Sequence, residues 1–322
     1  MRPFKISLVI PVYNESSHIE TSITTICTIL QAHSLAYQFV LIDDGSRDDT
    51  WQVLQKLAQT LPGIKAIKFS RNFGKEAALC AGLEAADGDA CLVMDADLQH
   101  PPELIPKMVK IWREEGFDVV EGIKRNRGHE SGLYKICANL FYRTFNRLSG
   151  FDLRGASDFK LMDRKVVDAW QRLQEKDTFF RGMSAWVGFT RYRLEFKVAR
   201  RAAGDGKWSP VTLGKLFISA ITAFSSLPLQ IITFLGGLFF IGSLLLAAQT
   251  LYMKFYGIAY SGFTTVILLQ LIIGSALMLS LGIIGTYLAR IYDEVKNRPR
   301  YIISTEISSL RPDESSGLES SH

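Results

Sequence analysis

About the first 120 residues alternate short apolar runs with longer segments of helical periodicity. Four apolar runs have the length of buried strands, at residues 6–10, 39–42, 65–69 and 91–94. Three amphipathic segments have the length of helices, at residues 16–31, 50–61 and 75–86. Strand–helix–strand repeats predict an α/β fold in which helices cover a mostly parallel sheet. In such a sheet, ligands bind at the carboxyl ends of the strands.

Charged side chains nearly disappear in a long stretch toward the C-terminus. From Leu216 to Ala289 the only formally charged side chain is Lys254, although 21% of all residues are charged and the net charge is +5. Residues 230–252 and 263–289 would be about 34 and 40 Å long as helices, enough to cross a hydrocarbon core of about 30 Å. They predict a two-helix transmembrane hairpin, the second helix with some tilt. The alternative, two buried helices of a soluble core, would require unusual length and lack of charge.

Basic residues flank this hairpin on both sides: Lys207 and Lys215 before it, and Arg290, Lys296, Arg298 and Arg300 after it. By the positive-inside rule, both termini should face the cytoplasm. The apolar run at residues 6–12 is too short for a secretory signal, so the large N-terminal part should also stay inside. Four cysteines lack the spacing of a metal site, and in a reducing cytosol we expect them to be small core residues: Cys27, Cys80, Cys91 and Cys137.

These signals predict four regions. Residues 1–210 form a cytoplasmic domain, 211–228 a juxtamembrane amphipathic helix, 229–290 the transmembrane hairpin, and 291–322 a cytoplasmic tail with a polar, serine-rich end. A second amphipathic segment at 133–148 fits a helix on the bilayer and a core helix equally well. The glycines of the linker at 200–210 predict a mobile loop that orders over bound nucleotide.

A polar cluster follows each of the four expected strands. The clusters are residues 11–15 (PVYNE), 43–46 (DDGS), 70–75 (SRNFGK) and 95–99 (DADLQ). The second cluster is also a good turn and helix start, and the third could merely end a strand and begin a helix. The same third cluster offers backbone donors and cations to a phosphate. We expect all four clusters to surround one crevice at the carboxyl edge of the sheet.

The last cluster suggests a divalent metal. If the strand continued through it, Asp95, Asp97 and Gln99 would project to the same side, because alternate residues of a strand share a face. Oxygen ligands of this kind suit Mg²⁺ or Mn²⁺. Two aspartates alone would more often be a solvated acidic turn, and it is the neighbouring clusters that favour the metal site.

Phosphate, metal and base recognition in one crevice indicates a nucleotide ligand, with no nucleic-acid partner expected. The G-x-G-x-x-G and G-x-x-x-x-G-K-[ST] signatures are both absent. Their absence argues against a dinucleotide oxidoreductase and against a P-loop nucleoside triphosphatase.

Together, the motifs resemble glycosyltransferase family 2 enzymes with a GT-A fold. Within that family the chain is similar to the polyprenyl-phosphate glycosyltransferases related to dolichyl-phosphate mannose synthase, in particular the bacterial bactoprenol glucosyltransferases. The resemblance rests on the four clusters, on residues 158–162 (DFKLM), on Arg181, Gly182, Trp186, Gly188 and Phe189, and on the apolar hairpin with its basic exit.

The resemblance implies roles for individual residues. Asp95, Asp97 and Gln99 would hold the metal that bridges the diphosphate, with Asp95 also touching the nucleotide sugar. Arg201 and Lys207 would place positive charge over the leaving nucleotide, with a membrane-surface anchor as the less favoured alternative for Lys207. The nucleoside pocket would be lined by five residues, with Asp44 as the uracil partner: Pro11, Tyr13, Glu15, Asp44 and Lys75.

Asp158 stands where the family has its candidate catalytic base. A lipid monophosphate has a second pKa near 6, so it is already mostly dianionic at neutral pH and needs little proton removal. We therefore expect Asp158 chiefly to orient the acceptor phosphate and to take any residual proton. Ser157 and Lys160 depart from the Gly and Arg usual in the subgroup.

The resulting hypothesis is transfer of a hexose, with glucose expected first, from a UDP-sugar to undecaprenyl phosphate. The reaction would invert the anomeric carbon at the cytoplasmic face of a bacterial inner membrane and serve envelope glycans such as O-antigen lipopolysaccharide. Homo-oligomers and a downstream flippase or membrane glycosyltransferase are conceivable partners. Alternatives are another donor (UDP-amino-arabinose, UDP-N-acetylhexosamine or GDP-mannose) and a non-catalytic membrane scaffold. A processive synthase is disfavoured, since no QxxRW-like motif is present and two spans are too few for a channel.

Overall fold

The computed structural model describes residues 4–124, 157–173, 175, 179–196, 227–256 and 262–309. These residues belong to two compact units. The first unit is an α/β domain that also includes the chain from Pro299 onward, and the second contains two long helices.

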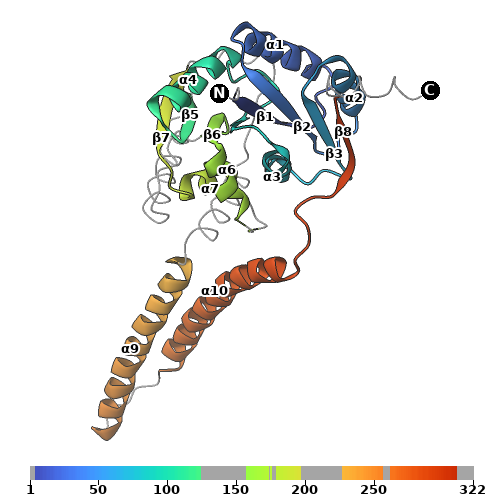
Figure 1. The fold of residues 1–322 in the computed structure, drawn as a ribbon. Coiled ribbons are helices and arrows are strands. Elements are labelled where there is room, and N and C mark those ends of the chain that lie inside the picture. Colours follow the sequence, from blue (N-terminus) through green and yellow to red (C-terminus); the bar gives the residue numbers. More distant parts are fainter. Residues whose placement is uncertain are drawn as a thin grey trace, which may run out of the picture. The chain divides into compact units, whose positions relative to one another are not determined.

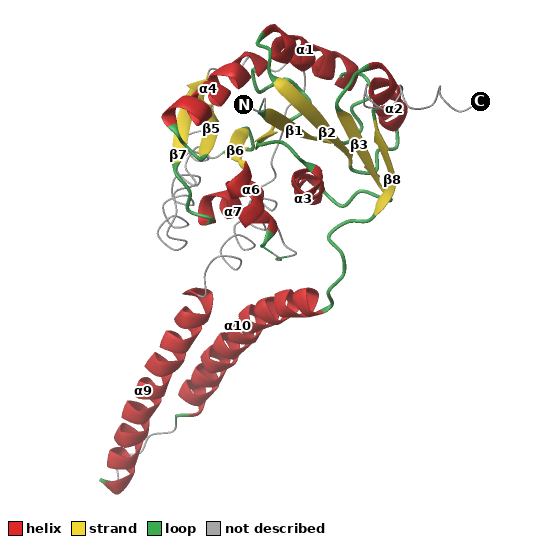
Figure 2. Ribbon diagram, in the orientation of Figure 1, coloured by secondary structure: helices red, strands yellow, loops and turns green. Residues whose placement is uncertain are grey.

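An eight-stranded sheet of order β7-β5-β6-β4-β1-β2-β3-β8 forms the centre of the first unit (Figure 2). Six strands run parallel, while β6 and β8 run antiparallel to their neighbours. The predicted mostly parallel sheet is therefore confirmed. The strands are β1 (Lys5–Val12), β2 (Ala36–Asp43), β3 (Ile64–Phe69), β4 (Ala90–Val93), β5 (Val119–Lys124), β6 (Lys160–Asp163), β7 (Arg191–Phe196) and β8 (Ile303–Ser308).

Helices cover both faces of this sheet (Figure 1). One face carries α1 (Ile19–Ala32), α2 (Thr50–Thr60) and α4 (Ile105–Glu115), the last preceded by the short 3-10 helix η1 (Pro102–Leu104). The other face carries α3 (Lys75–Ala85), α6 (Arg164–Gln171) and α7 (Phe180–Trp186). All strands and helices expected within residues 6–94 are present. The largest difference is three residues, as at α1, expected from Ser16 and observed from Ile19.

The alternation of side chains along β1 explains how one strand serves two cores. Leu8 and Ile10 are fully buried in the cluster beneath α1, α2 and α4. Val9 points to the opposite face, where α3 approaches so closely that a Cβ at Gly82 would lie 2.2 Å from its side chain. Burial on both faces is why the expected strands at residues 39–42 and 91–94 read as continuous apolar runs rather than as alternating ones.

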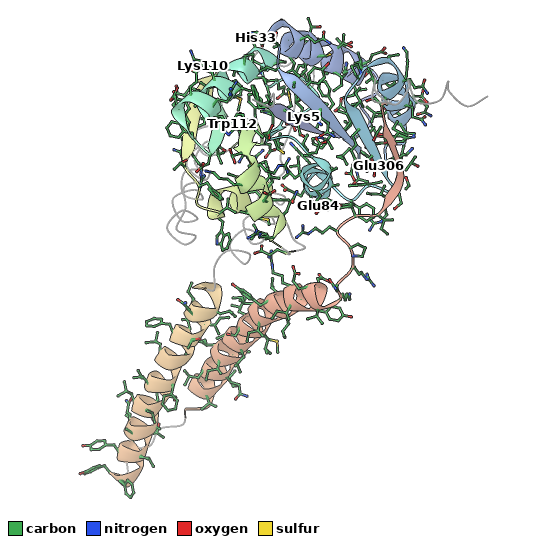
Figure 3. The ribbon with its side chains drawn as sticks, viewed as in Figure 1. Lys5, His33, Glu84, Lys110, Trp112 and Glu306 are labelled. Atoms are coloured by element: carbon green, nitrogen blue, oxygen red, sulfur yellow. The ribbon has the colours of Figure 1, made fainter. Side chains whose placement is uncertain are left out.

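Residues 291–322, expected as a cytoplasmic tail, include the end of a helix and one strand among their described positions. The helix continues to Val295, and Ile303–Ser308 forms β8, which pairs with β3 at the edge of the sheet. Tyr301 stacks on Phe69 with ring centroids 4.9 Å apart and donates a 2.5 Å hydrogen bond to Glu84. Figure 3 labels Glu84 on α3 and Glu306 on β8. A polar strand at an exposed edge has no strong apolar pattern, which is why its sequence did not reveal it.

The second unit consists of α9 (Leu227–Phe255) and α10 (Phe263–Val295). Both include the expected spans, 230–252 and 263–289, and extend beyond them. Leu229–Met253 and Leu269–Val295 are long and apolar enough to cross a membrane. Most of their described leucine, isoleucine and phenylalanine side chains are exposed within this unit. A helix that is apolar all round and unburied is unsuited to water, so these helices indicate membrane association.

Several sequence-based expectations lie outside the described residues. These are the amphipathic segment 133–148, the linker loop at 200–210, Cys137, and the amphipathic segment 211–228 except for its last two residues, which begin α9. They stay predictions. The other three cysteines, Cys27, Cys80 and Cys91, are buried, as expected of small core residues.

Candidate functional site

The four polar clusters come together at the carboxyl edge of the parallel strands. They line a cavity of about 300 Å³ beside β4, β1, β2 and β3, which are neighbours in the sheet. The lining residues are Pro11, Val12, Tyr13, Glu15, Asp44, Asn72, Gly74, Lys75, Asp95, Ala96 and Asp97. The crevice predicted from the sequence is thus present, and it includes every residue expected in the nucleoside pocket.

Asp44 joins two of these strand ends. Its carboxylate accepts hydrogen bonds from the backbone N–H groups of Phe73 (2.6 Å) and Gly74 (2.9 Å). Gly45 permits this approach: its φ is +68°, and a Cβ there would lie 2.4 Å from the backbone of Arg71. Burial raises the pKa of Asp44, although the two amides oppose the shift. Each carboxylate oxygen retains a second acceptor position for a ligand N–H.

The acidic motif does not lie on a strand, which corrects the reasoning used to predict it. Strand β4 ends at Val93, and Leu98 has a φ of 54°, so strand alternation cannot align Asp95, Asp97 and Gln99. The motif is instead a turn in which the Gln99 backbone N–H donates to Asp97 Oδ1 at 3.0 Å. Asp95 and Asp97 still line the cavity, whereas Gln99 does not.

The donor set of this turn fits a metal shared with a ligand. Among the described residues, no group of three His, Cys, Asp or Glu side chains is arranged to hold a metal alone. Mg²⁺ is commonly bound through one or two carboxylates together with substrate phosphates, and two carboxylates are what Asp95 and Asp97 offer. Burial raises the pKa of Glu15, and the neighbouring Asp97 adds to this shift.

Lys75 connects the acidic turn to Asp158. Its ammonium lies 2.5 Å from Asp95 Oδ1 and 2.9 Å from Asp158 Oδ2. Burial by itself would lower the pKa of Lys75, but the two carboxylates raise it above its ordinary value. Lys75 is therefore charged at neutral pH. It links Asp95, expected at the metal, to Asp158, expected at the acceptor phosphate.

Asp158 is held by a second cation, Arg181, for which the sequence suggested no role. Arg181 Nε donates to Oδ1 at 2.7 Å and Nη2 donates to Oδ2 at 2.9 Å. Burial alone would raise the pKa of Asp158, but Arg181 and Lys75 hold it well below its usual range. A carboxylate with so low a pKa is a poor proton acceptor at neutral pH. The geometry therefore favours the orienting role expected for Asp158 over the proton-accepting one.

Lys160, the departure noted beside Asp158, faces the interior of the domain. Its side chain is 3% exposed and pairs with Glu121 at 3.3 Å, and its ammonium donates to Ser184 Oγ at 2.7 Å. Glu121 in turn accepts the Ser157 backbone N–H at 3.1 Å. Lys160 thus links β5 and α7 behind Asp158 and is not available to a phosphate.

Two further polar residues next to the site were also not predicted. His100 stacks on Phe159 at 4.9 Å, and its Nδ1 accepts a long hydrogen bond from the Asp95 backbone N–H at 3.4 Å. Glu76 follows Lys75 and reaches α7, as described below. The sequence signal for Glu76 was a second charged residue, next to Lys75, at the start of a helix whose middle is apolar. Arg201 and Lys207, the cations expected over the leaving nucleotide, lie outside the described residues.

Comparison with known proteins places these features in a family. The chain matches the Glycosyl transferase family 2 model over residues 7–170. It is 38% identical over 304 residues to the uncharacterized glycosyltransferase YkcC of Bacillus subtilis, covering 94% of each chain. It is 36% identical over 304 residues to the bactoprenol glucosyl transferase of Shigella phage SfII, covering 93% of this chain and 97% of that protein. The chain belongs to glycosyltransferase family 2.

The resemblance drawn from the motifs is therefore confirmed, and the chain is a glycosyltransferase whose GT-A domain is followed by two apolar helices. Among solved structures it is similar to Staphylococcus aureus TarS 1-349 in complex with UDP-GlcNAc, with 18% identity, a TM-score of 0.48 and coverage of 68% of this chain and 65% of that one. It is also similar to glucosyl-3-phosphoglycerate synthase from Mycobacterium tuberculosis in complex with Mn²⁺, UDP-Glc and phosphoglyceric acid, with 21% identity, a TM-score of 0.45 and coverage of 68% and 78%.

Proposed function

We propose that this enzyme transfers glucose from UDP-glucose to a polyprenyl phosphate at the cytoplasmic face of a bacterial membrane. The observation that carries the proposal is the cavity at the four strand ends, which Asp44, Lys75 and the acidic turn line together. The sequence similarity between this protein and the bactoprenol glucosyl transferase of Shigella phage SfII extends along nearly the whole chain, including both apolar helices.

The donor would lie in the 300 Å³ cavity, with its base near Asp44 and its diphosphate near the acidic turn. Asp44 is already oriented by two backbone amides, so it can accept from a uracil N–H without rearranging. Asp95 and Asp97, with Gln99 as a further candidate, would hold Mg²⁺ or Mn²⁺. When bound, such a cation supplies positive charge to the departing diphosphate.

The acceptor would approach from the side of Asp158. Lipid monophosphate is mostly dianionic at neutral pH, so it would be repelled by a bare carboxylate and attracted by cations. Arg181 and Lys75 are 44% and 41% exposed, and both are held in place by Asp158, which is 8% exposed. In this arrangement Asp158 orients the acceptor through its two cations, and no proton has to move.

The reaction would be a single inverting displacement. A phosphate oxygen of the acceptor forms a bond to the anomeric carbon while the bond from that carbon to the UDP oxygen breaks, leaving UDP and a glycosyl phospholipid. Residues of this chain hold the two substrates in line, which lowers the entropic part of the barrier. The apolar helices α9 and α10 would anchor the chain to the membrane that contains the acceptor, with both termini in the cytoplasm.

The test is an assay of the detergent-solubilised chain with radiolabelled UDP-glucose, polyprenyl phosphate and Mg²⁺ or Mn²⁺. We expect label in the organic phase, and we expect Asp97→Ala to abolish it. Asp87→Ala is the matched control, because Asp87 is an exposed aspartate paired with Lys5 at 2.7 Å, away from the cavity. Label from UDP-glucose that stays in the aqueous phase would reject the proposal.

A further inference from the structure

Glu76 is a buried carboxylate that connects two helices at the edge of the site. It is the second residue of α3, and its Oε2 accepts the backbone N–H of Phe180, the first residue of α7, at 2.7 Å. The two partners are 104 residues apart in the sequence. Both helices belong to the α/β domain, so this contact lies within one compact unit.

The immediate neighbours of this hydrogen bond are the two cations that hold Asp158. Lys75 precedes Glu76 on α3, and Arg181 follows Phe180 on α7. Lys75 and Arg181 both contact Asp158, at 2.9 Å and 2.7 Å. The contacts therefore form a closed ring, in which the hydrogen bond from the Phe180 N–H to the Glu76 carboxylate holds the two cation-bearing helices together. If α7 moved away from α3, one cation would leave Asp158.

We propose that Glu76 is a positioning residue, which fixes α7 to α3 so that Lys75 and Arg181 together hold Asp158 and present their charge to the acceptor phosphate. The inference rests on the proposed function for the identity of that phosphate. It assigns Glu76 no contact with either substrate. The role of Glu76 depends on the acceptor oxygen of its side chain and not on the negative charge of its carboxylate.

The surroundings of Glu76 support this role. Burial raises its pKa to about 7, while the Phe180 amide opposes the shift and the nearby Asp158 adds to it. An apolar side chain would avoid this unfavourable burial. However, it would leave the Phe180 N–H without the acceptor that ties it to α3. Packing of an apolar side chain at position 76 would therefore not replace the hydrogen bond that ties α7 to α3. That bond requires an acceptor oxygen at this position.

The test compares Glu76→Gln, which keeps an acceptor oxygen, with Glu76→Ala, which removes it. Glu20→Ala is the control, since Glu20 is an exposed glutamate of α1 paired with Lys56 at 3.1 Å. Three quantities are measured on the full chain in detergent: kcat and KM for polyprenyl phosphate, the affinity for UDP with Mn²⁺, and amide hydrogen exchange in the peptide that contains α7.

For Glu76→Ala we expect kcat/KM for polyprenyl phosphate to fall about 10- to 100-fold, as for loss of other residues that orient a binding group. We expect UDP affinity to stay within about twofold, because no lining residue of the cavity is altered, and α7 exchange to accelerate about tenfold. Glu76→Gln should restore all three quantities to within about threefold of the unaltered chain, because its amide oxygen replaces the lost acceptor.

Unchanged exchange in Glu76→Ala would overturn the inference, as would equal losses of acceptor and UDP binding, which indicate general damage to the fold. Failure of Glu76→Gln to restore transfer would overturn it as well. If the unaltered chain transfers no sugar to polyprenyl phosphate, the proposed function fails. The exchange measurement would still decide whether Glu76 fixes α7, so the two failures are distinguishable.

Discussion

Lys75 and Asp158 form an ion pair of 2.9 Å between the start of α3 and the segment before β6. The same ammonium lies 2.5 Å from Asp95 in the acidic turn. One cation therefore couples the residues proposed to bind the diphosphate to those proposed to orient the acceptor. Any change in this ion pair should affect transfer more strongly than it affects nucleotide binding alone.

Asp158→Asn tests the orienting role of the aspartate. The amide keeps the size of the side chain but removes the charge that holds Lys75 and Arg181, so we expect kcat to fall about 100-fold. The measurement is transfer to polyprenyl phosphate in detergent with excess acceptor. Near-normal turnover would show that Asp158 does not orient the acceptor phosphate.

A second prediction concerns the divalent metal. We expect treatment with a chelator to abolish transfer, and added Mg²⁺ or Mn²⁺ to restore it, because two carboxylates and a diphosphate need a cation between them. Asp97→Ala should remove this restoration, while Asp87→Ala should retain it. Full activity of the unaltered chain in excess chelator would show that Asp95 and Asp97 have another role.

Glu76 should give the enzyme a measurable pH dependence of stability. Its pKa is raised from 4.5 to about 7 by burial. The folded state therefore binds more protons than the unfolded state between these values, and stability should fall as pH rises through this range and level off above it. Glu76→Gln should reduce this fall, so its advantage over the unaltered chain should be larger at about pH 8 than at about pH 5. The free energy of unfolding of both proteins is measured with denaturant at the two pH values. The same difference in free energy between the two proteins at both pH values would contradict the prediction.

The buried pair of Lys160 and Glu121 should be costly to break from one side. Lys160→Met leaves Glu121 buried without its cation, and we expect a loss of about 3 kcal/mol in the free energy of unfolding. Lys160→Met with Glu121→Leu removes both charges and should recover much of that loss, although the Ser157 N–H then loses its acceptor. A double variant less stable than Lys160→Met would contradict this interpretation.

Much of the fold could be predicted from the sequence because its strands are buried on both faces. The run at residues 39–42, for example, is apolar and fully buried, and a polar cluster follows it directly. The positions of Asp44, Lys75 and Asp95 around one cavity followed from these strand ends and from the parallel order of the sheet. Strand β8 was missed because its side chains are mostly exposed and polar.

The contacts behind the site could not be predicted in the same way. Arg181 meets Asp158 across 23 residues, and Glu76 meets Phe180 across 104 residues. Neither separation corresponds to a local period of helix or strand. Similarly, the arrangement of the acidic turn depends on the positive φ of Leu98, which a residue of that type rarely adopts.

The central claim is that glucose moves from UDP-glucose to a polyprenyl phosphate. Its most direct test is to incubate the full chain in lipid nanodiscs with polyprenyl phosphate and each of a panel of nucleotide sugars, and to determine the mass of the lipid product. We predict a polyprenyl phosphate extended by one hexose with UDP-glucose, together with release of UDP. An unmodified lipid with UDP-glucose and an extended one with a different donor would contradict the claim.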